Sequence, residues 1–276
     1  LHSFKGLGFE TDSEERFNSM LIGGEGIILV SGPTGSGKTT TLYSTLNKLE
    51  SPDVNIVTVE DPIEYDLDNI NQAQINAKSG VTFASALRSI LRQDPDIIMV
   101  GEVRDEETVE LGIRAALTGH LVFSTIHTND AASGFTRLLN WNVEPFLIAS
   151  TVKGILAQRL VRRVCKECRQ PYEASEDELR MIGLEPQDSF EAYKGKGCLA
   201  CRNTGFKGRI GIYELLLVDA EISELVLEQA PGYKIREQAR KNGMRTLLED
   251  GIIKVNRGDT TISEVYETLG TTKIII

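Results

Sequence analysis

Apolar runs of strand length alternate with helix-length segments of mixed polarity between residue 27 and about residue 141. Four of these runs are apolar almost throughout, so we expect each strand to be covered on both faces, as in a parallel sheet. The four candidate strands are Ile27–Ser31, Asn55–Glu60, Ile97–Gly101 and Leu121–Ile126. Alternation of strands and helices is typical of βαβ units and predicts an α/β core.

Helical periodicity fills the intervals between the strands and continues after them. The candidate helices are Lys38–Leu49, Thr82–Gln93, Asp105–Leu117 and Ala131–Asn140. We expect a further helix from Pro145 to about residue 163, followed by a segment rich in Cys, Gly and basic residues up to residue 208. From Ile210 the pattern predicts one strand and then short amphipathic helices, the last opened by a capping box from Thr261 to Glu264.

A phosphate-binding motif joins the first predicted strand to the first predicted helix. It reads Gly32-Pro33-Thr34-Gly35-Ser36-Gly37-Lys38-Thr39, and Thr40 completes the nucleotide-binding set. Gly32 and Gly37 let the backbone curl so that N–H groups point at phosphate oxygens, and the helix N-terminus adds its positive dipole end. Lys38 would contact the β- and γ-phosphates, and the Thr39 hydroxyl would coordinate Mg²⁺. The motif therefore predicts a site for ATP and Mg²⁺.

The third predicted strand lacks the Asp with which many P-loop enzymes hold Mg²⁺, because it ends in Gly101-Glu102. Glu102 follows the strand tip directly, where a carboxylate can orient or deprotonate the attacking water. The alternative is a solvated loop carboxylate. We predict Glu102 as the catalytic carboxylate.

A second acidic cluster, Glu60-Asp61-Pro62-Ile63-Glu64, closes the second predicted strand. Carboxyl ends of parallel strands meet at one edge of the sheet, so the cluster can face the γ-phosphate beside the P-loop. Pro62 excludes a helix at this turn and holds the flanking carboxylates in place. An acidic surface turn is the alternative.

Two histidines flank the fourth predicted strand. His127 follows its carboxyl end, where a neutral imidazole could sense the γ-phosphate through a hydrogen bond. His120 precedes the opposite end and could equally be a core or interface residue. His127 is therefore the candidate site residue.

Three arginines lie near the third predicted strand. Arg88 and Arg92 are four residues apart, which predicts one shared helix face, and Arg104 follows Glu102 by two residues. In multimeric P-loop motors such arginines cross a subunit boundary to stabilise charge on the transferred phosphoryl group. Local pairing with Asp94, Asp96 or Asp105 is the alternative.

All four cysteines fall in two pairs with two residues between partners, Cys165 with Cys168 and Cys198 with Cys201. Both pairs together can hold one tetrahedral Zn²⁺ through thiolates, and the four protein ligands would make the site structural. Unligated thiols are the alternative. The neighbouring segment is locally basic through Arg159, Arg162, Arg163, Lys166 and Arg169, so it could meet an acidic partner or anionic lipid, or be a solvated face.

Composition restricts the classes of partner. Lys and Arg number 30 against 40 Asp and Glu, and the net charge of -10 argues against general polyanion binding. Aromatic residues make up only 6%, which disfavours a nucleic-acid motor with a zinc finger. No run approaches the roughly 20 apolar residues of a membrane span, so we expect a soluble, cytoplasmic chain. The acidic residues disfavour a third alternative, a module that binds ATP without turnover.

Four blocks occur in a fixed order: GPTGSGKTTTLY, VEDPIEY, LRQDPDIIMVGEVRD and TGHLVFSTIHTND. The succession resembles the secretion and pilus-assembly ATPases of the GspE/PilB family over nearly the whole chain. The blocks look like that family's Walker A, Asp box, Walker B and His box. The resemblance implies that Glu64 is the Asp-box acid, Glu102 the Walker-B acid, and His120 and His127 the His-box pair.

The resemblance also implies an oligomeric state, a cellular process and protein partners. The family's motors are hexameric rings in which arginines, here Arg88, Arg92, Arg104 and Arg209, take part in contacts between subunits. They power type II protein secretion or type IV pilus assembly from the cytoplasmic face of the inner membrane, with platform and recruitment proteins as partners. The four cysteines resemble an insertion of secretion and pilus-extension ATPases that retraction ATPases lack.

The expected fold is therefore a RecA-like P-loop NTPase core with a mostly parallel sheet, a small zinc-binding insertion and a helical C-terminal subdomain. We divide the chain at residues 20, 160 and 209. Residues 1–20 would end a linker from a preceding domain, and 21–160 would form the ATPase core. Residues 161–209 would form the zinc subdomain and 210–276 the mainly helical C-terminal subdomain.

Overall fold

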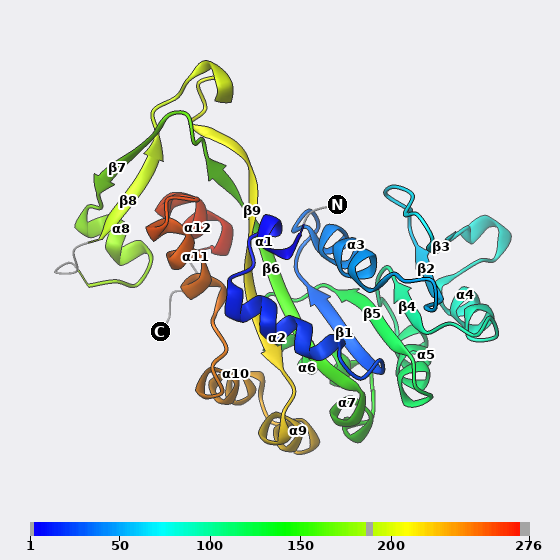
Figure 1. Ribbon diagram of the computed structural model, residues 1–276. Coiled ribbons are helices and arrows are strands. Elements are labelled where there is room, and N and C mark those ends of the chain that lie inside the picture. Colours follow the sequence, from blue (N-terminus) through cyan, green and yellow to red (C-terminus); the bar gives the residue numbers. More distant parts are fainter. Residues whose placement is uncertain (1–2, 186–189, 271–276) are drawn as a thin grey trace. The chain divides into compact units, whose positions relative to one another are not determined.

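The computed structural model describes residues 3–185 and 190–270 (Figure 1). They form two compact units. Unit 1 comprises residues up to 157 together with 215–244, and unit 2 comprises 158–214 together with the residues from 245 onward. The segments after residue 209 are thus shared between the units, and we describe each unit by itself.

The central sheet has seven strands in the order β3-β2-β4-β5-β1-β6-β9. Their bounds are β1 Gly26–Ser31, β2 Ile56–Glu60, β3 Asn71–Gln74, β4 Ile97–Val100, β5 Leu121–Ile126, β6 Val152–Val164 and β9 Phe206–Leu217. The pairs β1–β5, β1–β6, β2–β3, β2–β4 and β4–β5 are all parallel. Every residue of β1, β2, β4 and β5 is buried, which confirms the four predicted strands and their cover on both faces.

Helices of unit 1 pack on both faces of this sheet (Figure 1). Their bounds are α1 Phe4–Leu7, α2 Thr11–Leu21, α3 Lys38–Leu49, α4 Phe83–Ile90, α5 Glu106–Leu117, α6 Ala132–Asn140, α7 Pro145–Thr151, α9 Ala220–Leu227 and α10 Gly232–Lys241, with a short 3₁₀ turn at Ala77–Ser79. Thr82 caps α4 and Asp105 caps α5 by accepting a backbone N–H of the first turn. The four helices predicted between the strands are confirmed, although α4 ends three residues earlier than expected, at Ile90.

The predicted helix from Pro145 to residue 163 is wrong beyond Thr151. Helix α7 ends there, and β6 continues as a strand paired in parallel with β1. Most of β6 is buried, so its hydrophobic pattern has too little polar periodicity to separate strand from helix. Glycine at residue 154 lets β6 approach its neighbours closely, because a Cβ there would lie 2.5 Å from Sδ of Met20 and 2.7 Å from the carbonyl of Leu216.

Residues 3–20 are a packed part of unit 1. The rings of Phe4, Phe9 and Phe17 lie with centroids 5.2 to 5.6 Å apart, and the Lys48 ammonium lies 4.9 Å from the Phe4 ring centre. Arg16 donates to the carbonyl of Gly243. Residues 3–20, which were expected to belong to a linker, therefore pack within unit 1.

Unit 2 contains a two-stranded antiparallel sheet and short helices. The bounds are β7 Arg169–Glu173, β8 Glu191–Gly195, α8 Glu176–Met181, α11 Leu247–Asn256 and α12 Ile262–Leu269, with a 3₁₀ turn at Leu199–Cys201. Thr261 caps α12 as predicted, but the carboxylate of Glu264 binds Arg162 and so does not complete the capping box. None of the described helices is long and apolar enough to cross a bilayer.

Candidate nucleotide site and metal centre

The phosphate loop leaves the carboxyl end of β1 and enters α3. Gly35 and Gly37 adopt φ values of +78° and +89°, a region that side chains disfavour. No side chain caps the first turn of α3, in contrast to α4 and α5. The first N–H groups of a helix have no intrahelical acceptor, so this end of α3 is open to an anion. The backbone therefore fits the predicted triphosphate.

The side chains of the loop complete this arrangement. Nζ of Lys38 donates to the carbonyls of Gly32 at 2.8 Å and Pro33 at 3.0 Å, which holds the ammonium group against the loop. Thr39 and Thr40 follow in the first turn of α3, both half-buried. A cation and two hydroxyls thus lie at the helix end where phosphate and Mg²⁺ are expected.

The base of the loop is fastened to the end of β5 by residues that the sequence analysis missed. The Ser31 hydroxyl lies 2.6 Å from that of Thr128 and donates to its carbonyl at 3.2 Å. The N–H of Gly32 donates to the carbonyl of Ile126 at 3.3 Å. A hydroxyl at the last position of a buried strand, next to the loop, is the signal that could have identified Ser31.

Glu102 is placed by close packing of β4 against its neighbours. A Cβ at Gly101 would lie 3.3 Å from the backbone of Glu60, so glycine lets the end of β4 approach β2. The Thr125 hydroxyl donates to the carbonyl of Gly101 at 2.7 Å, and the N–H of Val103 donates to the carbonyl of Thr125 at 2.9 Å. The Glu102 side chain, 17% exposed, is therefore held at the carboxyl edge of the sheet.

Three predicted motifs meet at Glu102. Arg104 forms an ion pair with Glu102, and its Nη2 also lies 3.9 Å from Oδ2 of Asp61. Nε2 of His127 lies 3.5 Å from Oε2 of Glu102. Burial raises the pKa of Glu102, but the hydrogen bond and charge of Arg104, with a smaller contribution from His127, outweigh burial and hold that pKa below its usual value. Glu102 is therefore a carboxylate at neutral pH.

The predicted cluster of three arginines does not form as expected. Arg104 alone pairs with Glu102, whereas Arg88 pairs with Glu107 in the first turn of α5. Arg92 lies beyond the last residue of α4, so it does not share a helical face with Arg88. The alternative partners proposed for these arginines bind elsewhere: Asp96 accepts the N–H of Asn55, and Asp105 caps α5.

The acidic turn after β2 divides into one buried and two exposed carboxylates. Glu60 is 2% exposed and accepts hydrogen bonds from Tyr43 and Thr58, so it does not face the phosphate site as expected. Asp61 and Glu64 are exposed. Glu60 is the last residue of a fully buried strand, and this position is the sequence signal that could have separated it from the other two.

His120 lies at the opposite end of β5. Its Nδ1 lies 2.8 Å from the carbonyl of Ala115 and 3.1 Å from the Thr118 hydroxyl, at the end of α5. These contacts give His120 a local structural role, and His127 is the histidine that contacts Glu102.

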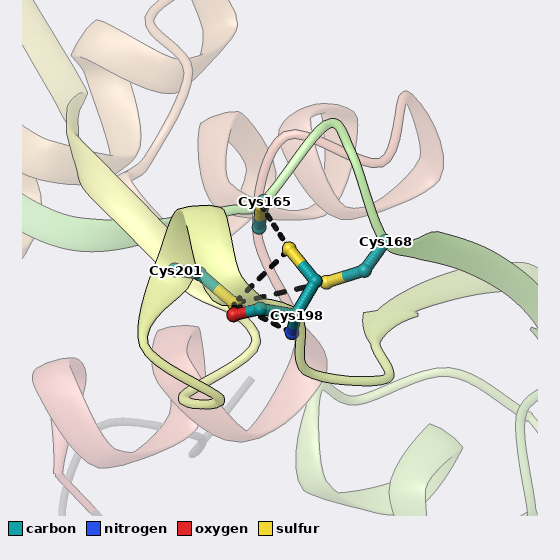
Figure 2. A group of neighbouring side chains, drawn as sticks. All are labelled: Cys165, Cys168, Cys198 and Cys201. Atoms are coloured by element: carbon teal, nitrogen blue, oxygen red, sulfur yellow. Dashed lines mark hydrogen bonds between the residues drawn. The ribbon is translucent and has the colours of Figure 1, made fainter.

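The four cysteines of unit 2 converge from two loops (Figure 2). Their sulfurs all lie within 4.8 Å of one another, with 3.8 Å between Cys165 and Cys198, 3.9 Å between Cys168 and Cys201, and 3.7 Å between Cys198 and Cys201. Sulfurs bound to Zn²⁺ at about 2.3 Å in a tetrahedron lie about 3.8 Å apart, whereas disulfide sulfurs lie about 2 Å apart. The geometry fits one zinc ion and no disulfide.

Backbone N–H groups support the sulfurs. Gly197 donates to Cys168 at 3.3 Å, and Cys198 and Gly205 donate to Cys201 at 3.2 and 3.3 Å. Burial raises the pKa of Cys201, but the N–H groups of Cys198 and Gly205 and the neighbouring thiols outweigh burial and bring the pKa to about 6. Among residues 3–185 and 190–270, this is the one cluster of His, Cys, Asp or Glu side chains that could hold a metal ion through three or more ligands.

The basic residues near the cysteines have separate environments. Arg162 forms an ion pair with the buried Glu264, and its guanidinium lies 4.2 Å from the Phe206 ring centre. Arg159 is buried, whereas Lys166 and Arg169 are exposed. Only part of this segment is therefore a solvated basic face.

A parallel α/β sheet whose first strand leads through a glycine-rich loop into an uncapped helix defines a RecA-like P-loop NTPase fold. The chain is similar to the solved pilus retraction motor PilT with bound ADP, with a TM-score of 0.73 and 30% identity over 99% of this chain and 68% of that one. The chain belongs to the type II/IV secretion system protein family, whose model matches residues 1–267.

Two curated relatives narrow the comparison. The chain is 50% identical over 261 residues to the type IV pilus assembly ATPase PilB of Thermus thermophilus, covering 94% of this chain and 29% of that protein. It is 47% identical over 265 residues to the type II secretion system ATPase E of Vibrio cholerae, covering 96% of this chain and 52% of that protein. The chain thus spans about half or less of these relatives, and the family resemblance expected from the four motifs is confirmed.

Proposed function

We propose that this chain hydrolyses ATP as the motor of a type II secretion or type IV pilus assembly machine. The observation that carries the proposal is the placement of Lys38 and Glu102 at the same carboxyl edge of the sheet. Lys38 would hold the phosphates and the Glu102 carboxylate would orient the attacking water. Membership of the family supports this reading.

The remaining residues would assist this chemistry. Glu64 would act as a second acid, and His127, in contact with Glu102, would sense the γ-phosphate. Bound Mg²⁺, coordinated by Thr39, would neutralise charge on the phosphates. The low pKa of Glu102 makes it a better orienter of water than a proton acceptor, because a weakly basic carboxylate takes a proton less readily.

A hexameric ring would complete the site. Arg88 and Arg92, on and just beyond α4, are exposed and could contact a nucleotide bound to a neighbouring subunit. Arg104 would have the same role once nucleotide competes for its pairing with Glu102. Arg209 is exposed in unit 2. The ring would work at the cytoplasmic face of the inner membrane, where platform and recruitment proteins would bind it. Its exposed basic residues would contact anionic lipid, and it would not bind nucleic acid.

Zinc would be structural in this motor, because four thiolates leave no open coordination position. The four cysteines favour secretion or pilus extension over retraction. The greater identity to the PilB and type II relatives, 50% and 47%, than to PilT, 30%, agrees with that choice.

Replacing Glu102 with Gln tests the proposed hydrolysis. The change keeps side-chain volume and removes the charge, so we expect ATP binding to stay within about threefold and phosphate release to fall at least about 100-fold. Nucleotide binding would be followed by fluorescence and phosphate by a coupled assay in the intact protein. Glu106→Gln, at an exposed neighbouring position, is the matched control. Unchanged phosphate release in Glu102→Gln would overturn the catalytic role.

A further inference from the structure

The hydroxyl of Tyr43 is the centre of a buried network between α3 and the acidic turn. Tyr43 is fully buried and Glu60 is 2% exposed. The hydroxyl donates to Oε2 of Glu60 and accepts from the N–H of Glu64 at 3.4 Å and from Nε2 of Gln72 at 3.3 Å. A phenol offers one donor and two acceptor positions, so the three bonds satisfy it completely.

Glu60 is held by neutral donors on its other side. Its Oε1 accepts from the Thr58 hydroxyl at 2.6 Å and from Nε2 of Gln72 at 3.1 Å. No ion pair involves Glu60 within the part of the chain that the structure describes. A buried carboxylate without a cation costs free energy, and an apolar pair of equal size would serve folding as well or better. The pair therefore needs an explanation besides stability.

The network joins two parts of the proposed nucleotide site. Tyr43 follows Thr39 by four residues on α3, one helical turn beyond the end that would bind phosphate. At its other side the network holds the backbone of Glu64, whose own side chain is exposed. Burial, the hydrogen bond to Glu60 and the charge of Glu60 raise the pKa of Tyr43, so the phenol keeps the proton that it donates.

We infer that Tyr43 and Glu60 are positioning residues that fix the turn carrying Glu64 against the nucleotide-binding helix. The inference rests on the proposed hydrolysis. Neither residue touches substrate in this arrangement, since both act through the backbone of Glu64. A displacement of the first turn of α3 would be transmitted to Glu64 through one hydroxyl, and a displacement of about 1 Å can cost about 100-fold in rate.

Replacing Tyr43 with Phe removes the hydroxyl and keeps the ring. In the intact protein we expect kcat for ATP to fall about tenfold or more, with KM changed less than about threefold, because phosphate contacts remain. Thr45→Val is the matched control, since Thr45 is a buried hydroxyl on the same helix that donates only to the carbonyl of Thr41. It should leave kcat within about twofold.

A double-mutant cycle separates positioning from general weakening. If Tyr43 acts through Glu64, then Tyr43→Phe should reduce kcat less than about twofold further in a Glu64→Gln background. Multiplicative effects, or an unchanged kcat in Tyr43→Phe, would overturn the inference. Thermal unfolding checks that the variants fold, and Glu60→Gln, tested in the same cycle, replaces Tyr43→Phe should that variant unfold. A parent protein that releases no phosphate would instead overturn the proposed function.

Discussion

Arg104 keeps Glu102 in its charged form and at the same time binds its carboxylate in an ion pair. The guanidinium pairs with Glu102 and reaches Asp61, so two acidic motifs share one cation. Without that cation, burial would dominate the environment of Glu102, and burial alone raises a carboxyl pKa. The charge state of the proposed catalytic residue thus depends on a side chain that is itself mostly exposed.

The titration of Glu102 should therefore change when Arg104 is replaced. In Arg104→Gln we expect the pKa of Glu102 to rise, because the favourable charge is lost while burial remains. Carbon-detected NMR of the carboxyl group from pH 3 to 8 would measure the shift. Arg114→Gln, which alters an exposed pair with Glu110, should leave that titration in place. A Glu102 pKa that stays the same in Arg104→Gln would contradict the role of the ion pair.

Two helices of the core carry interior glycines with opposite surroundings. A Cβ at Gly112 in α5 would lie 3.9 Å from the nearest atom, a methyl group of Val122, beside an apolar cavity of about 20 Å³. A Cβ at Gly134 in α6 would lie 2.5 Å from Cδ1 of Ile155 and 3.0 Å from Cδ1 of Ile126. The first position has space and the second has none.

Alanine at these positions should change stability in opposite directions. Gly112→Ala should raise the free energy of unfolding by about 0.5–1 kcal/mol, because alanine favours the helix and fills space. Gly134→Ala should lower it by about 1–3 kcal/mol, since buried isoleucines must move. Urea unfolding of both variants, measured side by side, would test the contrast. A loss of stability in Gly112→Ala would show that α5 needs the glycine.

The strands of the central sheet show which elements a sequence predicts and which it does not. The strands β1, β2, β4 and β5 are predictable because both of their faces are buried and most of their residues are therefore apolar. The strand β3, with the polar sequence NQAQ at the sheet edge, carries no such signal and was missed. Strand β6 mixes buried apolar residues with Lys153, Gln158 and three arginines, so its pattern alone does not separate strand from helix, and its pairing with β1 decides between them.

Site residues follow the same division. The phosphate loop and the cysteine pairs could be predicted because their chemistry depends on contiguous spacing. Which carboxylate of the acidic turn is buried depends on Tyr43, 17 residues earlier, and that contact is set by packing. The second partner of Arg104 is likewise beyond local reasoning, because Asp61 comes from a different strand end.

At the scale of the whole molecule, the chain divides into a unit that carries the phosphate loop and a unit that carries the four cysteines. The strands β6 and β9 run through both units. Apparent binding of structural zinc in small domains amounts to about 10–16 kcal/mol, which is comparable with the stability of a whole domain. A metal bound by the four cysteines would therefore add to the stability that the apolar core of unit 2 provides.

Zinc removal should loosen unit 2 locally. We expect one zinc per chain by elemental analysis, and chelation should speed exchange of the amides of Gly197, Cys198 and Gly205 at least about tenfold, because these N–H groups donate to the sulfurs. Hydrogen exchange followed by mass spectrometry would measure this, with amides of β4 as the internal reference. Cys198→Ser should reproduce the effect. Equal exchange with and without chelator would contradict a structural metal.

The uncapped N-terminus of α3 has a consequence for how the proposed motor would respond to ATP. The side chains of Thr82 and Asp105 cap the N-termini of α4 and α5, whereas no side chain caps the N-terminus of α3. Under the proposed function, the missing cap is the γ- and β-phosphates, and each turnover removes part of it. ATP binding would supply hydrogen-bond acceptors to the first turn of α3, and hydrolysis with phosphate release would remove some of them. Part of the free energy of nucleotide binding would therefore be used to order this turn.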